Sequence, residues 1–181
     1  MVSRAVQEVV ADDATLVAQA IDGNERAFAL LYKRHARYVA GIDYRLLGTD
    51  ADLDDVVQEA FVDASRALAS LDDPAGLRPW LARIVVRRIY KRLARRRHFR
   101  WLLGAVEHVA PRVSDPAQRE PVMALYRVLE TMTPKLRVPW TLHVVEGQTL
   151  PEVAANCETS LATIKRRVTE ASAMIERRLH E

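Results

Sequence analysis

Apolar residues recur at helical rather than strand spacing along almost the whole chain, and this period limits the folds open to it. The clearest run has apolar positions at Leu53, Val56, Val57, Ala60, Phe61, Ala64, Leu68 and Leu71. Asp72-Asp73-Pro74 breaks that helix, and another amphipathic stretch runs from 77 to about 101. An earlier helix, following Asn24, should end at Gly48. Apolar residues make up 49% of 181, enough to bury a core, so we predict an all-α fold.

Two small helical domains are predicted, joined by a flexible linker. The interruptions of the helical period are Gly104, Pro111, Ser114, Asp115, Pro116 and Pro121. We therefore interpret residues 103–121 as a mostly extended linker. A tail of residues 1–14 precedes the first domain, 15–102, and the second domain covers 122–181.

Charge inverts between the two central helices. Residues 50–73 carry eight acids against one base, Arg66, whereas residues 74–106 carry ten bases and no acid. Trp80, Tyr90, Phe99 and Trp101 lie among those bases. Cations hold phosphates and flat rings stack on bases, so this segment suits a nucleic acid. A solvated basic helix face or a disordered basic arm is the alternative interpretation.

The C-terminal residues have the pattern of a helix-turn-helix. Thr149-Leu-Pro-Glu152 fits a capping box, a turn follows at 156–159, and Ser160 can cap the final helix. The apolar stripe of that helix is Leu161, Ile164, Val168, Ala171, Ile175 and Leu179. The opposite face is centred near Arg166 and carries small and basic residues, which suits entry into a major groove. An ordinary helical hairpin with a charged outer face is the alternative.

Composition argues against several other classes of protein. The single cysteine, Cys157, permits no intramolecular disulfide and no cysteine-rich zinc site, which fits a reducing cytoplasm. No apolar run approaches the ~18 residues needed to span a bilayer, so we expect no membrane insertion. The acids at 50–55 lack EF-hand spacing, and the five histidines are scattered. We expect no metal, no cofactor, no catalytic residue and no enzyme activity.

Four sequence blocks, in this order and spacing, resemble the bacterial extracytoplasmic-function (ECF) sigma factors. They are residues 54–61, 78–84, 145–154 and 162–167. The resemblance covers about residues 13–180. It implies a dissociable subunit that binds core RNA polymerase and directs promoter recognition, opening and transcription initiation. The first domain would be sigma-2-like, and the second a sigma-4-like helix-turn-helix domain.

The resemblance implies three functional surfaces. Docking on the polymerase beta-prime coiled coil would use Asp54, Asp55, Gln58, Glu59 and Phe61. The minus-ten promoter element would meet Trp80, Arg83, Arg87, Arg88, Lys91, Arg92, Arg95 and Arg96. The minus-thirty-five element would meet Ser160, Ala162, Thr163, Lys165, Arg166 and Arg167. Further implied partners are the beta flap of the polymerase and an anti-sigma factor.

The chain departs from the family pattern at four positions. Many members carry Asn and Asp where this chain has Arg87 and Lys91, and glycine where it has Glu158. A left-handed turn would cost a non-glycine residue roughly 1 kcal/mol or more. Pro139 lies inside the helix that follows Thr133, where it should kink that helix.

Two other functions fit parts of the pattern. A stand-alone helix-turn-helix regulator would need no acidic docking helix, so residues 54–61 favour the polymerase subunit. A protein that mimics a sigma factor and titrates its inhibitor would keep the docking surfaces and lose DNA readout. The departures at Arg87, Lys91 and Glu158 keep that last alternative open, because they fall where DNA would be read.

Overall fold

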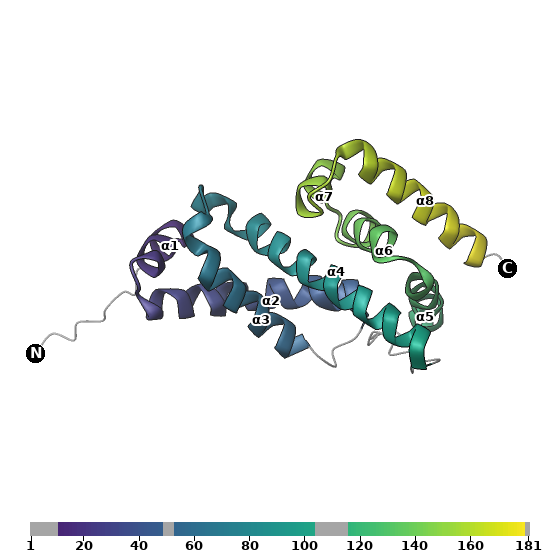
Figure 1. Cartoon of the computed structure of the whole chain (residues 1–181), viewed down its shortest axis with the longest axis horizontal. Coiled ribbons are helices and arrows are strands. Elements are labelled where there is room, and N and C mark those ends of the chain that lie inside the picture. The colour runs from purple at the N-terminus through teal and green to yellow at the C-terminus, as the bar shows by residue number, and fades with distance from the viewer. Residues whose placement is uncertain (1–10, 49–52, 104–115, 180–181) are drawn as a thin grey trace, which may run out of the picture.

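The computed structural model describes residues 11–48, 53–103 and 116–179. Every regular element in those ranges is a helix, which confirms the predicted all-α class (Figure 1). In chain order the elements are α1 (Asp13–Ile21), α2 (Glu25–Leu47), α3 (Leu53–Ala67), the 3₁₀ turns η1 (Leu68–Ser70) and η2 (Pro74–Gly76), α4 (Leu77–Leu103), α5 (Pro116–Thr131), α6 (Pro134–Trp140), the π-helical turn η3 (Thr141–Val145), α7 (Leu150–Asn156) and α8 (Leu161–Leu179). The expected tail up to residue 10 and the linker residues 104–115 lie outside the described ranges.

Local sequence signals fix both ends of α2 as predicted. The Asn24 side-chain oxygen accepts the N–H groups of Arg26 and Ala27 at 3.1 and 3.3 Å. Gly48 adopts a left-handed φ of 73°, and its N–H donates to the carbonyl of Tyr44 at 2.7 Å. Glycine reaches this conformation without the steric cost of a Cβ, so the helix ends there.

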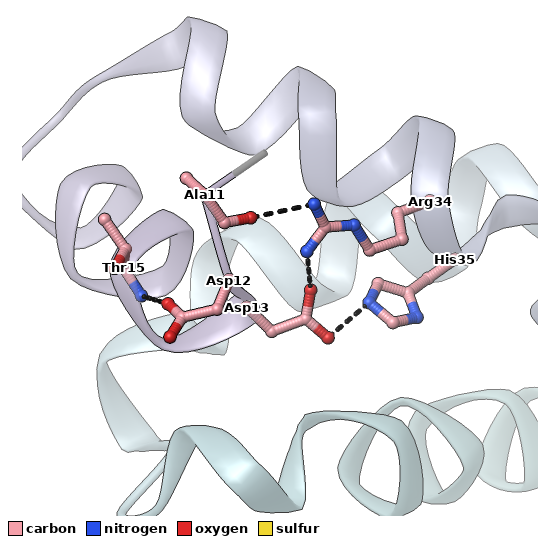
Figure 2. Close-up of polar contacts among 6 residues, drawn as sticks. All are labelled: Ala11, Asp12, Asp13, Thr15, Arg34 and His35. Carbon is pink, nitrogen blue, oxygen red and sulfur yellow. Dashed lines mark hydrogen bonds and ion pairs between the residues drawn. The ribbon is translucent and has the colours of Figure 1, made fainter. Parts of the chain in front are cut away.

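Polar contacts fasten α1 to α2 (Figure 2). Asp13 is the first residue of α1. One of its carboxylate oxygens lies 2.5 Å from a guanidinium nitrogen of Arg34, and the other lies 2.9 Å from Nε2 of His35. Arg34 also donates to the carbonyl of Ala11 at 2.8 Å. Asp12 caps the helix, so α1 begins at Asp13, inside the stretch that we expected to be a tail.

The core of the first module, residues 11–103, lies among α1, α2, α3 and α4. Its largest fully buried side chains are Leu16, Val17, Val39, Ile42, Leu46, Val85, Val86 and Ile89. Burial of each such side chain contributes roughly 1.5–3 kcal/mol. The helical period seen in the sequence therefore corresponds to real core-facing stripes.

The second module, residues 116–179, begins earlier than expected. Pro116 is the first residue of α5, a position that favours proline, whereas we expected the linker to reach residue 121. Pro121 lies inside α5. The module has its own small core, made of Val128, Leu129, Met132, Trp140, Ala171 and Ile175.

Pro139 lies inside α6, and the chain passes directly from α6 into the π-helical turn η3. In that turn the N–H of Glu146 donates to the carbonyl of Thr141 at 3.1 Å. A proline inside a helix removes one backbone donor. The kink expected at Pro139 stays a prediction.

The two modules pack against each other. Side chains of the second module join the core of the first: they are Val138, Leu142, Val153, Ala154 and Ile164. The contacts run mainly from α4 to α6 and α7, and from α2 to η3. In Figure 1, α6 and α7 accordingly lie alongside α4.

Candidate nucleic-acid and protein interfaces

The expected docking residues on α3 divide between surface and core. Asp54, Asp55, Gln58 and Glu59 are exposed. Phe61 is only 4% exposed and makes edge-on ring contacts with neighbouring aromatic side chains of α2. It falls on the same stripe as Val57 and Ala64, at helical spacings of four and three, and so it fills the core of its own module. Phe61 could anchor in the polymerase or fill this core, and the free chain has it in the core; its contact with the polymerase stays a prediction.

Arg88 faces α3 rather than open solvent. Its guanidinium pairs with Asp63 at 2.6 Å and also with Glu59, and its side chain is 24% exposed. In the free chain the Arg88 charge is thus paired within its own module, and its expected contact with DNA stays a prediction. The sequence of α4 does not distinguish Arg88 from its neighbouring arginines, because the acids that pair with Arg88 lie on another helix.

A groove of about 510 Å³ runs between α3 and α4. Val56 and Ile89 contribute apolar surface to its lining. Acidic residues of α3 and basic residues of α4 form the rest: Asp55, Glu59, Asp63, Arg88, Lys91, Arg92 and Arg95. The two oppositely charged surfaces expected from the sequence therefore meet along one groove.

A row of cations follows α4 at intervals of four residues. Arg87, Lys91 and Arg95 are exposed, and Arg83 is half-buried. Arg92 is half-buried, and the side chain of Arg96 falls outside the described part of the structure. Spacing by four keeps these residues on one side of the helix, so they form a continuous positive strip.

Trp80 does not belong to this strip. It is 8% exposed and packs in the core, on the same side of α4 as Leu77 and Ile84. A buried ring is not placed to stack on a base, so the expected contact of Trp80 with DNA stays a prediction. Tyr90 is half-buried.

The start of α8 presents the expected mixture of small and basic residues. Ala162, Lys165 and Arg166 are exposed, and Arg167 is half-buried. Ser160 caps the helix: its Oγ accepts the N–H of Thr163 at 3.2 Å and lies 2.8 Å from the Thr163 hydroxyl. Both hydroxyls are thus engaged within the helix end.

The apolar stripe of α8 is only partly buried. Ile164, Ala171 and Ile175 are buried, and Val168 is half-buried. Leu161 and Leu179, at the two ends of the stripe, are 39% and 46% exposed. The predicted stripe is therefore correct in its centre and wrong at its ends.

The turn before α8 contains a strained residue. Thr149 and Glu152 form the predicted capping box, and hydrogen bonds from Thr149 lower the pKa of Glu152. At the other end of α7, Glu158 has a φ of 50° and is the one non-glycine residue with positive φ among the described residues. The turn therefore keeps the left-handed geometry that glycine would adopt without strain.

Ion pairs and hydrogen bonds connect the two modules within the described part of the chain. Arg87 of α4 pairs with Glu158, and its hydrogen bond lowers the pKa of the Glu158 carboxyl. Arg45 of α2 pairs with Glu146 through two atoms, one of them donating at 2.8 Å. The hydroxyl of Tyr126 donates to the carbonyl of Arg45 at 3.0 Å. Sequence analysis missed Arg45, Glu146 and Tyr126, because the partners are 81 and 101 residues apart and carry no local signal.

Neither a membrane span nor a metal centre is found in the described ranges. No helix there is long and apolar enough to cross a bilayer. Among the same residues, no three histidine, cysteine, aspartate or glutamate side chains cluster in a way that could hold a metal ion.

Comparisons with known proteins match both modules. The family model "Sigma-70 region 2" matches residues 31–99, and "Sigma-70, region 4" matches residues 122–175. The ECF RNA polymerase sigma factor SigM of Mycobacterium tuberculosis is 29% identical over 167 residues, covering 92% of this chain and 84% of that protein. The RNA polymerase sigma factor CnrH of Cupriavidus metallidurans is 33% identical over 176 residues, covering 90% and 92%.

A solved structure gives the same result. CnrH in complex with the cytosolic domain of CnrY superposes with a TM-score of 0.64 at 30% identity, covering 93% of this chain and 97% of that chain. The chain therefore belongs to the ECF RNA polymerase sigma factors, non-enzymatic subunits that bind core RNA polymerase and promoter DNA and direct transcription initiation.

Proposed function

We propose that this sigma factor acts in the cytoplasm and binds the polymerase and the two promoter elements through three separate surfaces. The exposed acidic edge of α3 docks on the beta-prime coiled coil, the cationic strip of α4 holds the minus-ten element, and the start of α8 reads the minus-thirty-five element. The observation that carries this proposal is the separation of exposed charge between two neighbouring helices, with acids on α3 and bases on α4. One module can thereby bind a basic protein surface and a polyanion at once.

The docking edge consists of Asp54, Asp55 and Gln58, with Glu59 at its border. Asp54 and Asp55 are exposed in the first turn of α3. Glu59 already pairs with Arg88, so it has less charge to offer a partner. Complementary exposed charges accelerate encounter and fix the register of an interface.

The cationic strip of α4 is proposed to hold DNA through phosphates. Arg87, Lys91 and Arg95 are exposed, whereas the aromatic ring of Trp80 is buried and is not placed to stack on a base. Each phosphate contact with a single strand should lower the slope of log affinity against log salt by about 0.7. Minus-ten binding should therefore depend strongly on salt.

The start of α8 is proposed to read base edges. Ala162 is small enough to let the helix approach, and the exposed Arg166 can form two parallel hydrogen bonds with guanine. Arg167 is half-buried and turned toward the module, which suits a phosphate contact. Ser160 and Thr163 hold the helix end in place through their mutual capping bonds.

Two protein partners complete the proposal. The second module contacts the beta flap of the polymerase, and an anti-sigma factor covers the docking surfaces when the chain is idle. The solved relative CnrH was captured with the cytosolic domain of CnrY. In this chain we expect a segment of the inhibitor to bind in the α3–α4 groove, which has apolar surface between charged sides.

Charge reversal on α3 tests the docking surface. The double variant Asp54→Lys, Asp55→Lys should weaken binding to purified core polymerase by at least about 1 kcal/mol, roughly fivefold, because like charges would then face the basic partner. Asp72→Lys is the matched control, since Asp72 is exposed but follows η1 instead of lying on α3. Circular dichroism checks that helicity is kept. Equal affinity of the double variant and the control in a titration would refute the docking assignment.

A further inference from the structure

Two of the residues that depart from the sigma-factor pattern meet each other. Arg87 lies on the cationic strip of α4 and Glu158 lies in the turn of the helix-turn-helix, 71 residues away, yet their side chains form an ion pair. Each is unusual at its own position, and together they make a contact between the modules.

The backbone of Glu158 is left-handed. Its φ of 50° is a conformation that glycine adopts without strain and that a residue with a side chain rarely adopts. The carboxylate in this position meets a guanidinium, the same chemistry with which arginine binds a phosphate oxygen. Glu158 thus gives Arg87 an anionic oxygen partner of the kind that a phosphate would supply.

Packing around the ion pair extends the contact. Val86 and Tyr90 of α4 and Cys157 beside Glu158 line a shared cavity of about 310 Å³. Burial raises the pKa of both the Tyr90 hydroxyl and the Cys157 thiol. A second contact at Arg45 and Glu146 holds the modules from the end of α2.

We propose that Glu158 is an intramolecular latch, which stands in for DNA phosphate on Arg87 and adds to the apolar packing that holds the free chain in a closed arrangement. This inference rests on the proposed assignment of α4 to the minus-ten element. Closure occupies part of the cationic strip and brings the turn that precedes α8 onto the same helix. The two DNA-reading surfaces are then neighbours.

Chain geometry shows why the latch must open. Promoter elements 25 base pairs apart are separated by about 85 Å of duplex at 3.4 Å per pair. Glu158 touches α4, and the eight residues from it to Arg166 can span at most about 29 Å. The closed arrangement therefore cannot engage both elements, and separation of the modules precedes full promoter binding.

The single thiol of the chain reports closure directly, without DNA. Cys157 lies in the contact, so its rate of reaction with the disulfide reagent DTNB should rise when the modules separate. Glu158→Gln in the full chain should raise that rate about two- to fivefold, the range expected from loss of an exposed ion pair. Glu170→Gln, an exposed acid elsewhere on the second module, is the matched control and should leave the rate unchanged.

Arg87→Gln separates opening from a local electrostatic effect. Loss of a nearby positive charge alone would raise the thiol pKa and slow the reaction, whereas opening speeds it. The charge exchange Arg87→Glu, Glu158→Arg should restore the slow rate. Glu158→Gly relieves the strained turn and should raise both the melting temperature and the thiol rate, so a gain in reactivity cannot be attributed to unfolding. Unchanged rates in Glu158→Gln and Arg87→Gln would overturn the latch.

A DNA arm distinguishes failure of the latch from failure of the proposed function. A mixed-sequence single-stranded 12-mer should bind the free Glu158→Gln chain about two- to fivefold more tightly than the unaltered chain, and more tightly than Glu170→Gln. If the thiol rate rises but oligonucleotide affinity matches the control, the latch stands and the assignment of α4 to DNA falls. If neither changes, the latch falls.

Discussion

Gly48 offers the sharpest test of how the two modules pack. It ends α2 with a φ of 73°, and a Cβ there would lie 2.4 Å from Cδ1 of the Tyr126 ring in α5. Gly48→Ala should therefore meet two separate penalties. Left-handed backbone costs an alanine about 1–2 kcal/mol. Displacing Tyr126 also breaks its hydrogen bond to the Arg45 carbonyl, which is worth about 1 kcal/mol.

The two penalties add up to about 2–3 kcal/mol of unfolding free energy. A double-mutant cycle, measured by urea or thermal unfolding, separates one penalty from the other. For a chain of this size the sum corresponds to a fall in melting temperature of about 4–12 °C. In a Tyr126→Ala background only the backbone penalty remains, so the cost of Gly48→Ala should drop to about 1–2 kcal/mol. Gly23→Ala is the matched control: its φ is 91° with nothing within 4 Å, so its cost should be the same in both backgrounds. Equal costs of Gly48→Ala with and without Tyr126 would refute the packing of α5 on α2.

Three further predictions follow from single sites. Thr149→Ala removes the capping box of α7 and should cost about 1 kcal/mol of unfolding free energy, measured in urea. In polymerase holoenzyme, Arg166→Ala should weaken binding to the preferred upstream element by about 1–3 kcal/mol and relax the preference at one base position. Arg167→Ala should instead weaken binding to all sequences equally and lower the slope of log affinity against log salt. An unchanged base preference in Arg166→Ala would contradict the register of the helix. The hydrogen bond from Arg87 lowers the pKa of Glu158, so its contribution to closure is fully present above pH 4.5 and is lost as pH falls through the lowered pKa. The rate of Cys157 with a disulfide reagent, divided at each pH by the rate of glutathione to remove the change in thiolate fraction, should rise on that side only.

Sequence reasoning succeeded where the cause of a structure is local. The ends of α2 at Asn24 and Gly48 and the capping box at Thr149 depend on residues within one turn, and all three were predicted. At Glu158 the sequence left open whether the turn is strained or has another geometry, and the structure shows the left-handed one. The two-domain, helical organisation needed only the apolar period and the four sequence blocks.

The placements that could not be predicted from the sequence depend on neighbours distant in sequence. Trp80 and Phe61 looked suited to contacts with partners, but each lies on the buried stripe of its helix. Arg88 is held by acids of α3, and its charge looks the same in sequence as that of Arg87. Pro116 resembled a helix breaker because a proline at the first helical position is identical in sequence to one in a linker.

A DNA footprint on a target promoter, made with and without core RNA polymerase, tests the central claim most directly. The account predicts that the chain together with core polymerase protects both the minus-ten and the minus-thirty-five elements, and that the chain alone does not protect the two together. Protection of both elements by the chain alone, unchanged when core polymerase is added, would contradict it and would indicate a stand-alone helix-turn-helix regulator.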